Sequence, residues 1–247
     1  MAYLLYGIVK APDSLKQDVS LTGVKSKPVI FVEAHGLCAA VSEQDVEEGA
    51  PPVAELLTYA RVVEALHCRQ TVIPMRYGCF LNSIQAINDI LKVRQNQYGS
   101  LLAELDGHVE MGIRLILPIK ECKDILPGAS TLLQAESAID GRAYLANRKV
   151  QYQMQEEITQ DRQALIDLYT QAFSGLSSKH RTETAVKSGT LVVSLYFLTP
   201  GSDVIRFRET FGGMMAKGND GAMLSGPWPP YNFVTTDIGK YGDVIHT

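Results

Sequence analysis

Arg76 is the residue of this sequence best placed for binding chemistry, because it stands in a turn directly after a predicted strand. It belongs to the segment Pro74–Gly78 (PMRYG), which follows the short extended stretch Thr71–Pro74. A planar guanidinium at such a place can hold a phosphate or a carboxylate through parallel hydrogen bonds. The other interpretation is a structural ion pair with an acidic neighbour such as Glu64, and the sequence leaves both open.

Cysteine and histidine could bind a metal, but their spacing does not favour it. The four cysteines are Cys38, Cys68, Cys79 and Cys122. The five histidines are His35, His67, His108, His180 and His246. No two cysteines form a Cys-x-x-Cys pair, and neither His35/Cys38 nor His67/Cys68 has a second pair at zinc-finger spacing. We therefore expect free, buried thiols, no metal and no cofactor.

Catalytic motifs are missing from the sequence. It contains no Gly-x-Ser-x-Gly, no His-Glu-x-x-His and no kinase-type set. The glycines around Gly212 and Gly221 lack the Gly-Lys-Ser/Thr of a phosphate loop, so we interpret them as a flexible connection. We predict that the protein is not an enzyme and has no catalytic residues.

The composition indicates a core-forming chain without a nucleic-acid module. The 247 residues are 46% hydrophobic and 20% charged, and the net charge of −4 divides as −2 for residues 1–105 and −2 for residues 106–247. Neither half is basic, which argues against nucleic-acid binding. The start of the chain does not resemble a signal peptide, and apolar runs such as Leu191–Leu198 are too short to cross a bilayer. We expect a cytoplasmic protein that does not bind lipid membranes.

The segment Gly226–Phe233 (GPWPPYNF) holds the only tryptophan and three prolines. Proline cannot donate to a β ladder, so the segment is predicted to be an extended edge rather than a central strand or a helix. Two interpretations stay open. In the first, Trp228 fills a core, and truncating it costs more stability than truncating Tyr231. In the second, the aromatic residues form a recognition surface, where Trp and Tyr are favoured.

The first half of the chain is predicted to contain four strands and two helices. The strands cover residues 3–10, 28–33, 37–42 and 71–74, and the helices cover 53–68 and 83–104. Gly36 permits a tight turn between the second and third strands. We expect the second helix to break at Gly99. The apolar face of the first helix comprises Leu56, Tyr59, Ala60, Val63 and Leu66.

The second half is predicted to follow the order β-α-β-β-α-β of the ferredoxin-like plan. Its strands cover residues 107–117, 181–187, 190–198 and 222–226, and its helices cover 141–173 and 202–217. Strands 107–117 and 190–198 are the apolar ones and should be central. We predict an α+β protein with a domain over 1–105, a ferredoxin-like domain with a long first helix over 106–234, and a tail over 235–247.

Four segments of the sequence resemble the gas vesicle protein F/L family, in the expected order and most like the F member. They are Tyr3–Val9 (YLLYGIV), Thr71–Gly78 (TVIPMRYG), Gly141–Leu145 (GRAYL) and Gly226–Phe233. Together they span nearly the whole chain. Cys79 departs from the family pattern, since a small hydroxyl residue is expected there.

The resemblance implies a minor, accessory protein located at gas vesicles. In that family the role is assembly, through contact with the very apolar main shell protein and with other accessory proteins. Unassembled shell subunits expose apolar patches, which aggregate unless another protein binds them. The candidate partner-binding residues are Arg76, Trp228, Tyr231 and Phe233. The alternative is a regulator that binds a small molecule between the two domains near Arg76.

Overall fold

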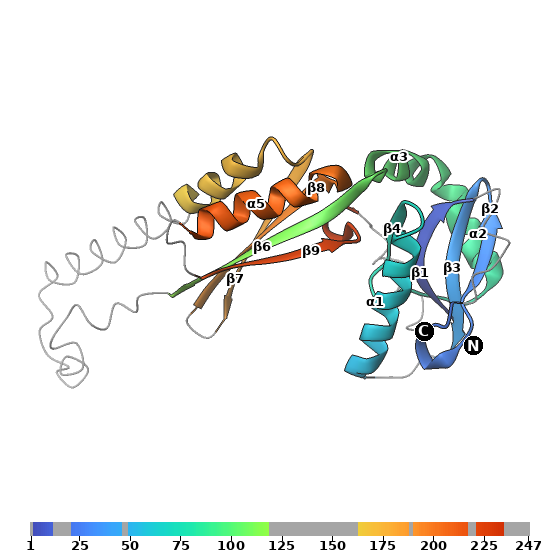
Figure 1. The fold of residues 1–247 in the computed structure, drawn as a ribbon. Coiled ribbons are helices and arrows are strands. Elements are labelled where there is room, and N and C mark those ends of the chain that lie inside the picture. Colours follow the sequence, from blue (N-terminus) through green and yellow to red (C-terminus); the bar gives the residue numbers. More distant parts are fainter. Residues whose placement is uncertain are drawn as a thin grey trace, which may run out of the picture. The chain divides into compact units, whose positions relative to one another are not determined.

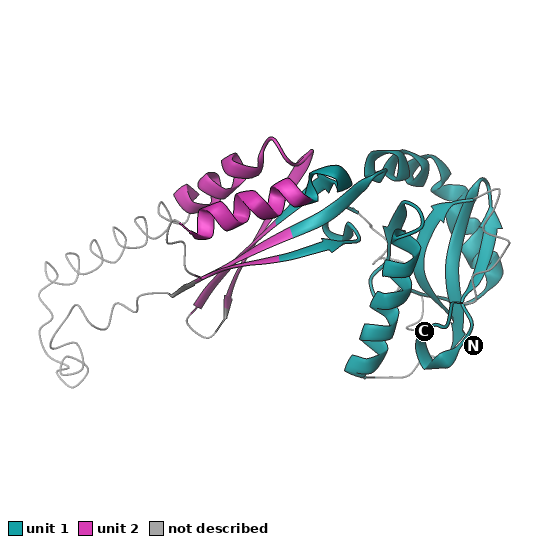
Figure 2. Cartoon of the chain, viewed as in Figure 1, with its two compact units in different colours: residues 1–111, 196–204, 225–247 teal, residues 112–195, 205–224 magenta. Residues whose placement is uncertain are grey.

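The computed structural model of this chain describes residues 2–11, 21–45, 49–118, 163–187, 190–216 and 221–234. The chain divides into two compact units, shown in Figure 2: residues 1–111, 196–204 and 225–247 form unit 1, and residues 112–195 and 205–224 form unit 2. Unit 1 thus includes residues from all three parts predicted from the sequence, which are 1–105, 106–234 and 235–247. The domain boundaries predicted from the sequence stay a prediction.

Unit 1 contains a five-stranded sheet with the order β2-β3-β1-β4, in which β5 also pairs with β1 (Figure 1). The strands are β1 (Ala2–Lys10), β2 (Ile30–Ala34), β3 (Leu37–Gln44), β4 (Val72–Pro74) and β5 (Phe80–Leu81). All the pairings within this sheet are antiparallel. His35 and Gly36 join β2 to β3 with φ angles of 54° and 75°, which a two-residue hairpin turn requires. The four predicted strands are confirmed, and β5 is an addition.

A bulge in β1 divides its apolar residues between the two faces of this sheet. The register against β3 shifts between Leu5 and Gly7, which leaves Tyr6 as the extra residue. Leu5 and Ile8 consequently belong to one buried cluster, whereas Tyr6 and Val9 belong to the other.

One helix packs on the Tyr6 side of the sheet and two pack on the Ile8 side (Figure 1). Helix α1 (Val53–His67) contributes Tyr59, Val62, Val63 and Leu66 to the Tyr6 cluster, and helices α2 (Ile84–Val93) and α3 (Gln95–Leu105) cover the Ile8 cluster. The predicted α1 face is wrong at its first turns, because Leu56 and Ala60 are exposed.

The break in the second predicted helix lies at Arg94 and not at Gly99. Arg94 has a ψ angle of 14°, and its carbonyl accepts a hydrogen bond from the Tyr98 N–H at 2.9 Å, so α3 starts immediately after α2. Gly99 lies inside α3. A helix interior tolerates glycine at a cost of about 1 kcal/mol relative to alanine, so this glycine does not force a break.

The second sheet has the strand order β7-β8-β6-β9. Its strands are β6 (His108–Pro118), β7 (Lys179–Lys187), β8 (Thr190–Pro200) and β9 (Ala222–Trp228). The prediction that the two apolar strands are central is confirmed, since β6 and β8 lie inside the order and β7 and β9 at its edges. Along β6, Met111, Ile113 and Leu115 are buried while Arg114 and Ile116 are exposed, as an alternating strand requires.

Two helices, residues 163–173 and α5 (Val204–Met215), lie on one side of this second sheet (Figure 1). The rings of Phe173 and Phe207 stack between them with centroids 4.2 Å apart, and both are buried. The helix predicted over 141–173 is described only from residue 163, and the segment Gly141–Leu145 lies outside the described residues. Among the described helices, none is long and apolar enough to cross a lipid bilayer.

Candidate partner-binding surface

The segment Gly226–Phe233 begins within the last residues of β9, where the backbone is in close contact with β6. Gly226 has a φ of 106°, and a Cβ at this position would lie 2.6 Å from the Glu110 carbonyl oxygen and 3.3 Å from the Cα of Met111. Only glycine fits a backbone that approaches so closely in this conformation. The following peptide bond, Gly226-Pro227, is cis.

Glu110 holds the same segment through its carboxylate. One carboxylate oxygen accepts a hydrogen bond from the Asn232 backbone N–H at 2.8 Å, and the other accepts one from the Asn232 side-chain amide at 2.7 Å. Glu110 is only 5% exposed. Hydrogen bonds to a carboxylate are about twice as strong as neutral ones. The turn η5 (Tyr231–Phe233) is therefore pinned to β6.

Tyr231 and Phe233 reach the core of unit 1 on the two faces of its sheet. Tyr231 packs against the Tyr6 cluster, and Phe233 packs against the Ile8 cluster. Burial raises the pKa of Tyr231, and the nearby charges of Glu110 and Glu64 raise it further. These two predicted partner-binding residues are half-buried, and their visible role is to brace the segment.

Trp228 lies on the surface, with 47% of its area exposed. The interpretation that Trp228 fills a core is therefore wrong. The buried positions are taken by Pro229 and Pro230, and Tyr231 follows them into the Tyr6 cluster. A rigid pair of anchored prolines thus presents the indole to solvent.

Tyr59 is the point at which two of the singled-out segments meet. Its hydroxyl lies 2.8 Å from the Leu5 carbonyl and 2.9 Å from the Met75 carbonyl, so it touches the segment Thr71–Gly78. Burial raises the pKa of Tyr59 well above its usual value, and the next largest cause is the charge of Tyr231. Tyr231 of the C-terminal segment packs against the same cluster that contains Tyr59.

The ring of Tyr59 is packed between two further tyrosines. It stacks on Tyr6 with centroids 4.9 Å apart and meets Tyr77 edge-on at 5.3 Å. The Tyr77 hydroxyl donates a hydrogen bond to the Glu55 carboxylate at 2.8 Å, which ties the turn to α1. The aromatic residues of both segments therefore form one rigid cluster with α1.

Arg76 projects from this turn and is exposed. Within the described ranges its side chain makes no hydrogen bond or ion pair, so the ion pair with Glu64 is not formed.

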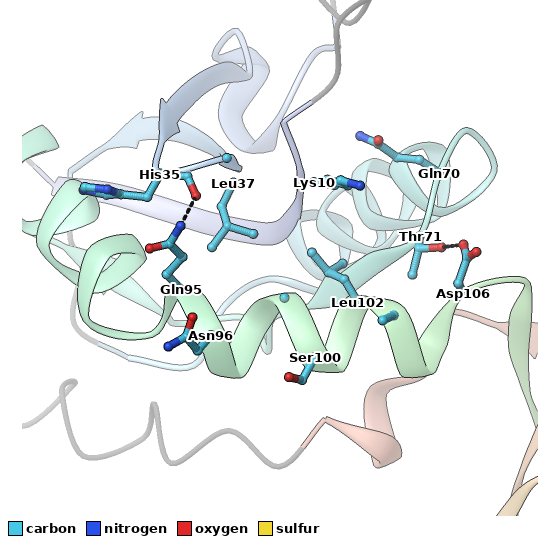
Figure 3. A pocket seen from close by; sticks show the side chains of 13 residues that line it. Lys10, His35, Leu37, Gln70, Thr71, Gln95, Asn96, Ser100, Leu102 and Asp106 are labelled. Carbon is cyan, nitrogen blue, oxygen red and sulfur yellow. Dashed lines mark hydrogen bonds between the residues drawn. The ribbon is translucent and has the colours of Figure 1, made fainter.

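A polar hollow of about 900 Å³ lies at one end of the first sheet, where α3 faces the β2–β3 turn (Figure 3). Its walls include Lys10, Gln70 and Ser100, and Gln95 spans it by donating to the His35 carbonyl at 3.0 Å. The buried Gln70 amide nitrogen has no hydrogen-bond partner among the described residues. Arg76 does not line this hollow.

The described thiols Cys38, Cys68 and Cys79 are free, and the expectation that all of them are buried is wrong for Cys68, which is exposed. Burial raises the pKa of Cys38 to about 12 and that of Cys79 to about 11, so the nucleophilic thiolate is scarce at neutral pH. In the described part of the chain no three His, Cys, Asp or Glu residues cluster as metal ligands. Cys122 lies outside the described residues, and the absence of a metal stays a prediction.

Sequence reasoning predicted the inward side of Tyr59 but missed the contact of Glu110 with Asn232. A signal existed for Glu110, because a carboxylate in the middle of an alternating strand needs a partner if its face is covered. The pairing with Asn232 joins residues far apart in sequence, and no spacing rule could have found it.

The comparisons with known proteins agree over nearly the whole chain. The profile of the family described as gas vesicle synthesis protein GvpL/GvpF matches residues 2–235. Gas vesicle protein F1 of Halobacterium salinarum is 24% identical over 239 residues, covering 95% of this chain and 93% of the relative. Gas vesicle protein L1 of the same organism is 24% identical over 256 residues, covering 96% and 91%.

A solved structure has the same fold. The crystal structure of the gas vesicle protein GvpF from Anabaena sp. PCC7120 superposes with a TM-score of 0.73 at 18% identity, covering 95% of this chain and 96% of that one. It confirms an α+β fold. With the profile match across residues 2–235, these findings show that the chain belongs to the gas vesicle protein L/F family.

Proposed function

We propose that this chain is an accessory protein of gas vesicles that binds the apolar main shell protein and assists vesicle nucleation and assembly. Membership of the family supports the gas vesicle role. The single observation that carries the binding role is Trp228, which is large, apolar and exposed although its neighbours are fixed. Tryptophan is the residue type most enriched among binding hot spots.

The physical advantage of this arrangement is pre-organisation. A partner that binds Trp228 does not have to order the chain around it, because Pro229, Pro230 and Asn232 are already held. The cost of ordering is a main reason why buried area does not become affinity. Arg76, which is exposed, can add a polar contact, while Tyr231 and Phe233 anchor the segment that carries Trp228.

The test is capture of the shell protein by the full chain, combined with flotation of intact vesicles. We expect wild-type protein and Trp228→Phe to capture the shell protein and to keep it from aggregating in a light-scattering assay. Trp228→Ala should lose at least tenfold in capture. No capture by wild-type protein and no association with vesicles in cells would overturn the proposal.

A second candidate function is that of a regulator that binds a small molecule. The polar hollow beside Lys10 favours it, because its buried Gln70 amide has no partner in the part of the chain that the structure describes. Gly99, which has no side chain, also leaves open space along α3. Lys10 and the amide groups are hydrogen-bond donors, and Lys10 offsets the charge of Asp106, which also lines the hollow. The matching ligand is a small organic acid.

A melting-temperature screen against organic acids tests this second function, since a ligand that binds only the folded state raises the melting temperature. Lys10→Gln should abolish a true shift, whereas Lys92→Gln, on the exposed side of α2, should not. A screen without any shift would remove this candidate.

A further inference from the structure

The first two turns of α1 are apolar on nearly every side, although they lie at the surface. Between Val53 and Ala60 the only charged residue is Glu55, and its carboxylate is occupied by the Tyr77 hydroxyl at 2.8 Å. Tyr59 faces inward, but Val53 is 71% exposed and Leu57 is 55% exposed. A helix that is apolar all round is normally buried all round.

These exposed side chains form one continuous feature, which we call the α1 apolar surface. It consists of Val53, Ala54, Leu56, Leu57 and Ala60. Leu56 also lines a hollow of about 390 Å³. Its other walls include the apolar residues Pro51, Pro52 and Phe80 and the charged residues Lys25, Asp45 and Glu55. A ridge beside a hollow is the shape that a second element can interlock with.

The neighbouring helix α2 behaves as a solvent-facing helix should. Its exposed positions are Gln85, Asp89 and Lys92, which are polar or charged, and one isolated apolar residue, Val93. The apolar exposure of α1 is therefore a local property of this helix rather than a general property of unit 1. Contiguous apolar exposure of this kind marks interaction sites.

The chemistry of the α1 apolar surface restricts what can cover it. A strand would need unpaired backbone groups to pair with, and a helix surface offers side chains only. A helix can pack there, because Val53 and Leu57 are four residues apart and form a ridge of the kind that fits the groove of another helix. A charged segment would lose hydration without gaining an opposite charge.

We infer that the α1 apolar surface is the docking site for an uncharged, apolar helical segment of the main gas vesicle shell protein. This inference rests on the function proposed above and gives it a second contact. The exposed side of α1 continues to the charged residue Glu64, where the apolar surface ends.

The test uses a matched pair of valine variants in the full chain. Val53→Glu places a charge in the α1 apolar surface, and Val93→Glu places the same charge on α2, where the valine is 77% exposed. A glutamate in the first turn of a helix is favourable to the helix dipole, so Val53→Glu should fold. Leu57→Lys, also exposed, is a second variant in case it does not.

We expect Val53→Glu and Leu57→Lys each to reduce capture of the shell protein at least tenfold, while Val93→Glu stays within twofold of wild type. If wild-type protein captures the shell protein and Val53→Glu does so equally well, the inference is wrong and the proposed function stands. If wild-type protein captures nothing, the proposed function itself fails. A wild-type dimer that Val53→Glu converts to a monomer would assign the surface to a second copy of this chain and overturn the inference.

Discussion

Glu110 and Asn232 are joined by two hydrogen bonds across 122 residues of sequence, and both acceptors are oxygens of one carboxylate. Both donors of Asn232 in this pair are N–H groups, one from the backbone and one from the side chain. The two carboxylate oxygens of Glu110 therefore each face an N–H donor of Asn232, and the contact fixes where the C-terminal segment runs. The exposure of Trp228 and the fixed positions of its neighbours depend on that placement.

Replacing Glu110 with glutamine should destabilise the protein by about 2 kcal/mol. Glutamine keeps one acceptor oxygen but turns an amide N–H₂ group toward an Asn232 donor, so at least one charge-assisted hydrogen bond is lost in a buried place. Urea unfolding measures the loss as a shift in midpoint at constant slope.

Glu209→Gln is the matched control for this change, since Glu209 is an exposed glutamate of α5. Its midpoint should move by no more than about 0.5 kcal/mol in equivalent free energy. Equal effects of the two substitutions would mean that the contact between Glu110 and Asn232 contributes little to stability.

Truncating Tyr231 should cost more stability than truncating Trp228, which is the reverse of what a tryptophan-filled core would give. Tyr231 packs into the Tyr6 cluster, so Tyr231→Ala should cost about 2 kcal/mol, somewhat less than a fully buried aromatic residue. Trp228→Ala should cost less than about 1 kcal/mol, because the indole is exposed. Denaturant midpoints of the two variants decide the order, and a larger loss for Trp228→Ala would restore the core interpretation.

Stability should fall with rising pH above about 10, because folding raises the pKa of buried tyrosines. Burial raises the pKa of Tyr98 from 10.0 to about 12, and the nearby Arg94 partly offsets this. Between these values the unfolded chain releases the proton and the folded chain keeps it, so the unfolded state gains stability. The contribution is fully present below pH 10 and is lost as the pH approaches 12.

Tyr98→Phe removes this titrating group and tests the assignment. Each group in its window changes the free energy of unfolding by about 1.4 kcal/mol per pH unit. The slope of stability between pH 10 and 12 should therefore become shallower in Tyr98→Phe than in wild-type protein. An unchanged slope would show that Tyr98 does not titrate in this range.

Local rules predicted the elements of this fold well, because hydrophobic period and turn residues act over a few positions. The strand order of the second sheet followed from the contrast between apolar and charged strands. The break at Arg94 was not predicted, because glycine permits a bend without causing one. The hydrogen bond from the Tyr98 N–H to the Arg94 carbonyl, which bridges α2 and α3, does not involve Gly99.

The location of Trp228 could not be predicted, because it depends on which of several neighbouring side chains fills the same buried space. Pro229, Pro230 and Tyr231 occupy that space, and the contact of Asn232 with Glu110 fixes the register in which they do so. Such competition is settled by residues far apart in sequence. The sequence also predicted Leu56 as buried, whereas 39% of its area is exposed.

Replacing Gly99 with alanine should stabilise the protein by about 1 kcal/mol. Gly99 lies inside α3, and an added Cβ would meet nothing within 4 Å, so only the gain in helix propensity remains. Gly107→Ala is the contrasting control. It also has open space around it, but its φ of 68° strains any residue with a Cβ. The two substitutions should shift the urea midpoint in opposite directions, and a destabilising Gly99→Ala would contradict the helical role of this position.

Binding of the shell protein should survive high salt. Trp228 and the α1 apolar surface carry no charge, and the net charge of the chain is only −4. Raising the salt from about 0.1 M to about 1 M shortens the screening length from about 10 Å to about 3 Å, which weakens charge attraction and leaves apolar burial intact. Calorimetric titration at the two salt concentrations should therefore give affinities within about threefold of each other. It should also give a negative heat-capacity change, the mark of apolar surface removed from water.

Arg76→Ala supplies the comparison, since losing this exposed cation should change affinity less than Trp228→Ala does. Complete loss of binding at high salt, or a larger effect of Arg76→Ala, would mean that charge rather than apolar contact holds the partner.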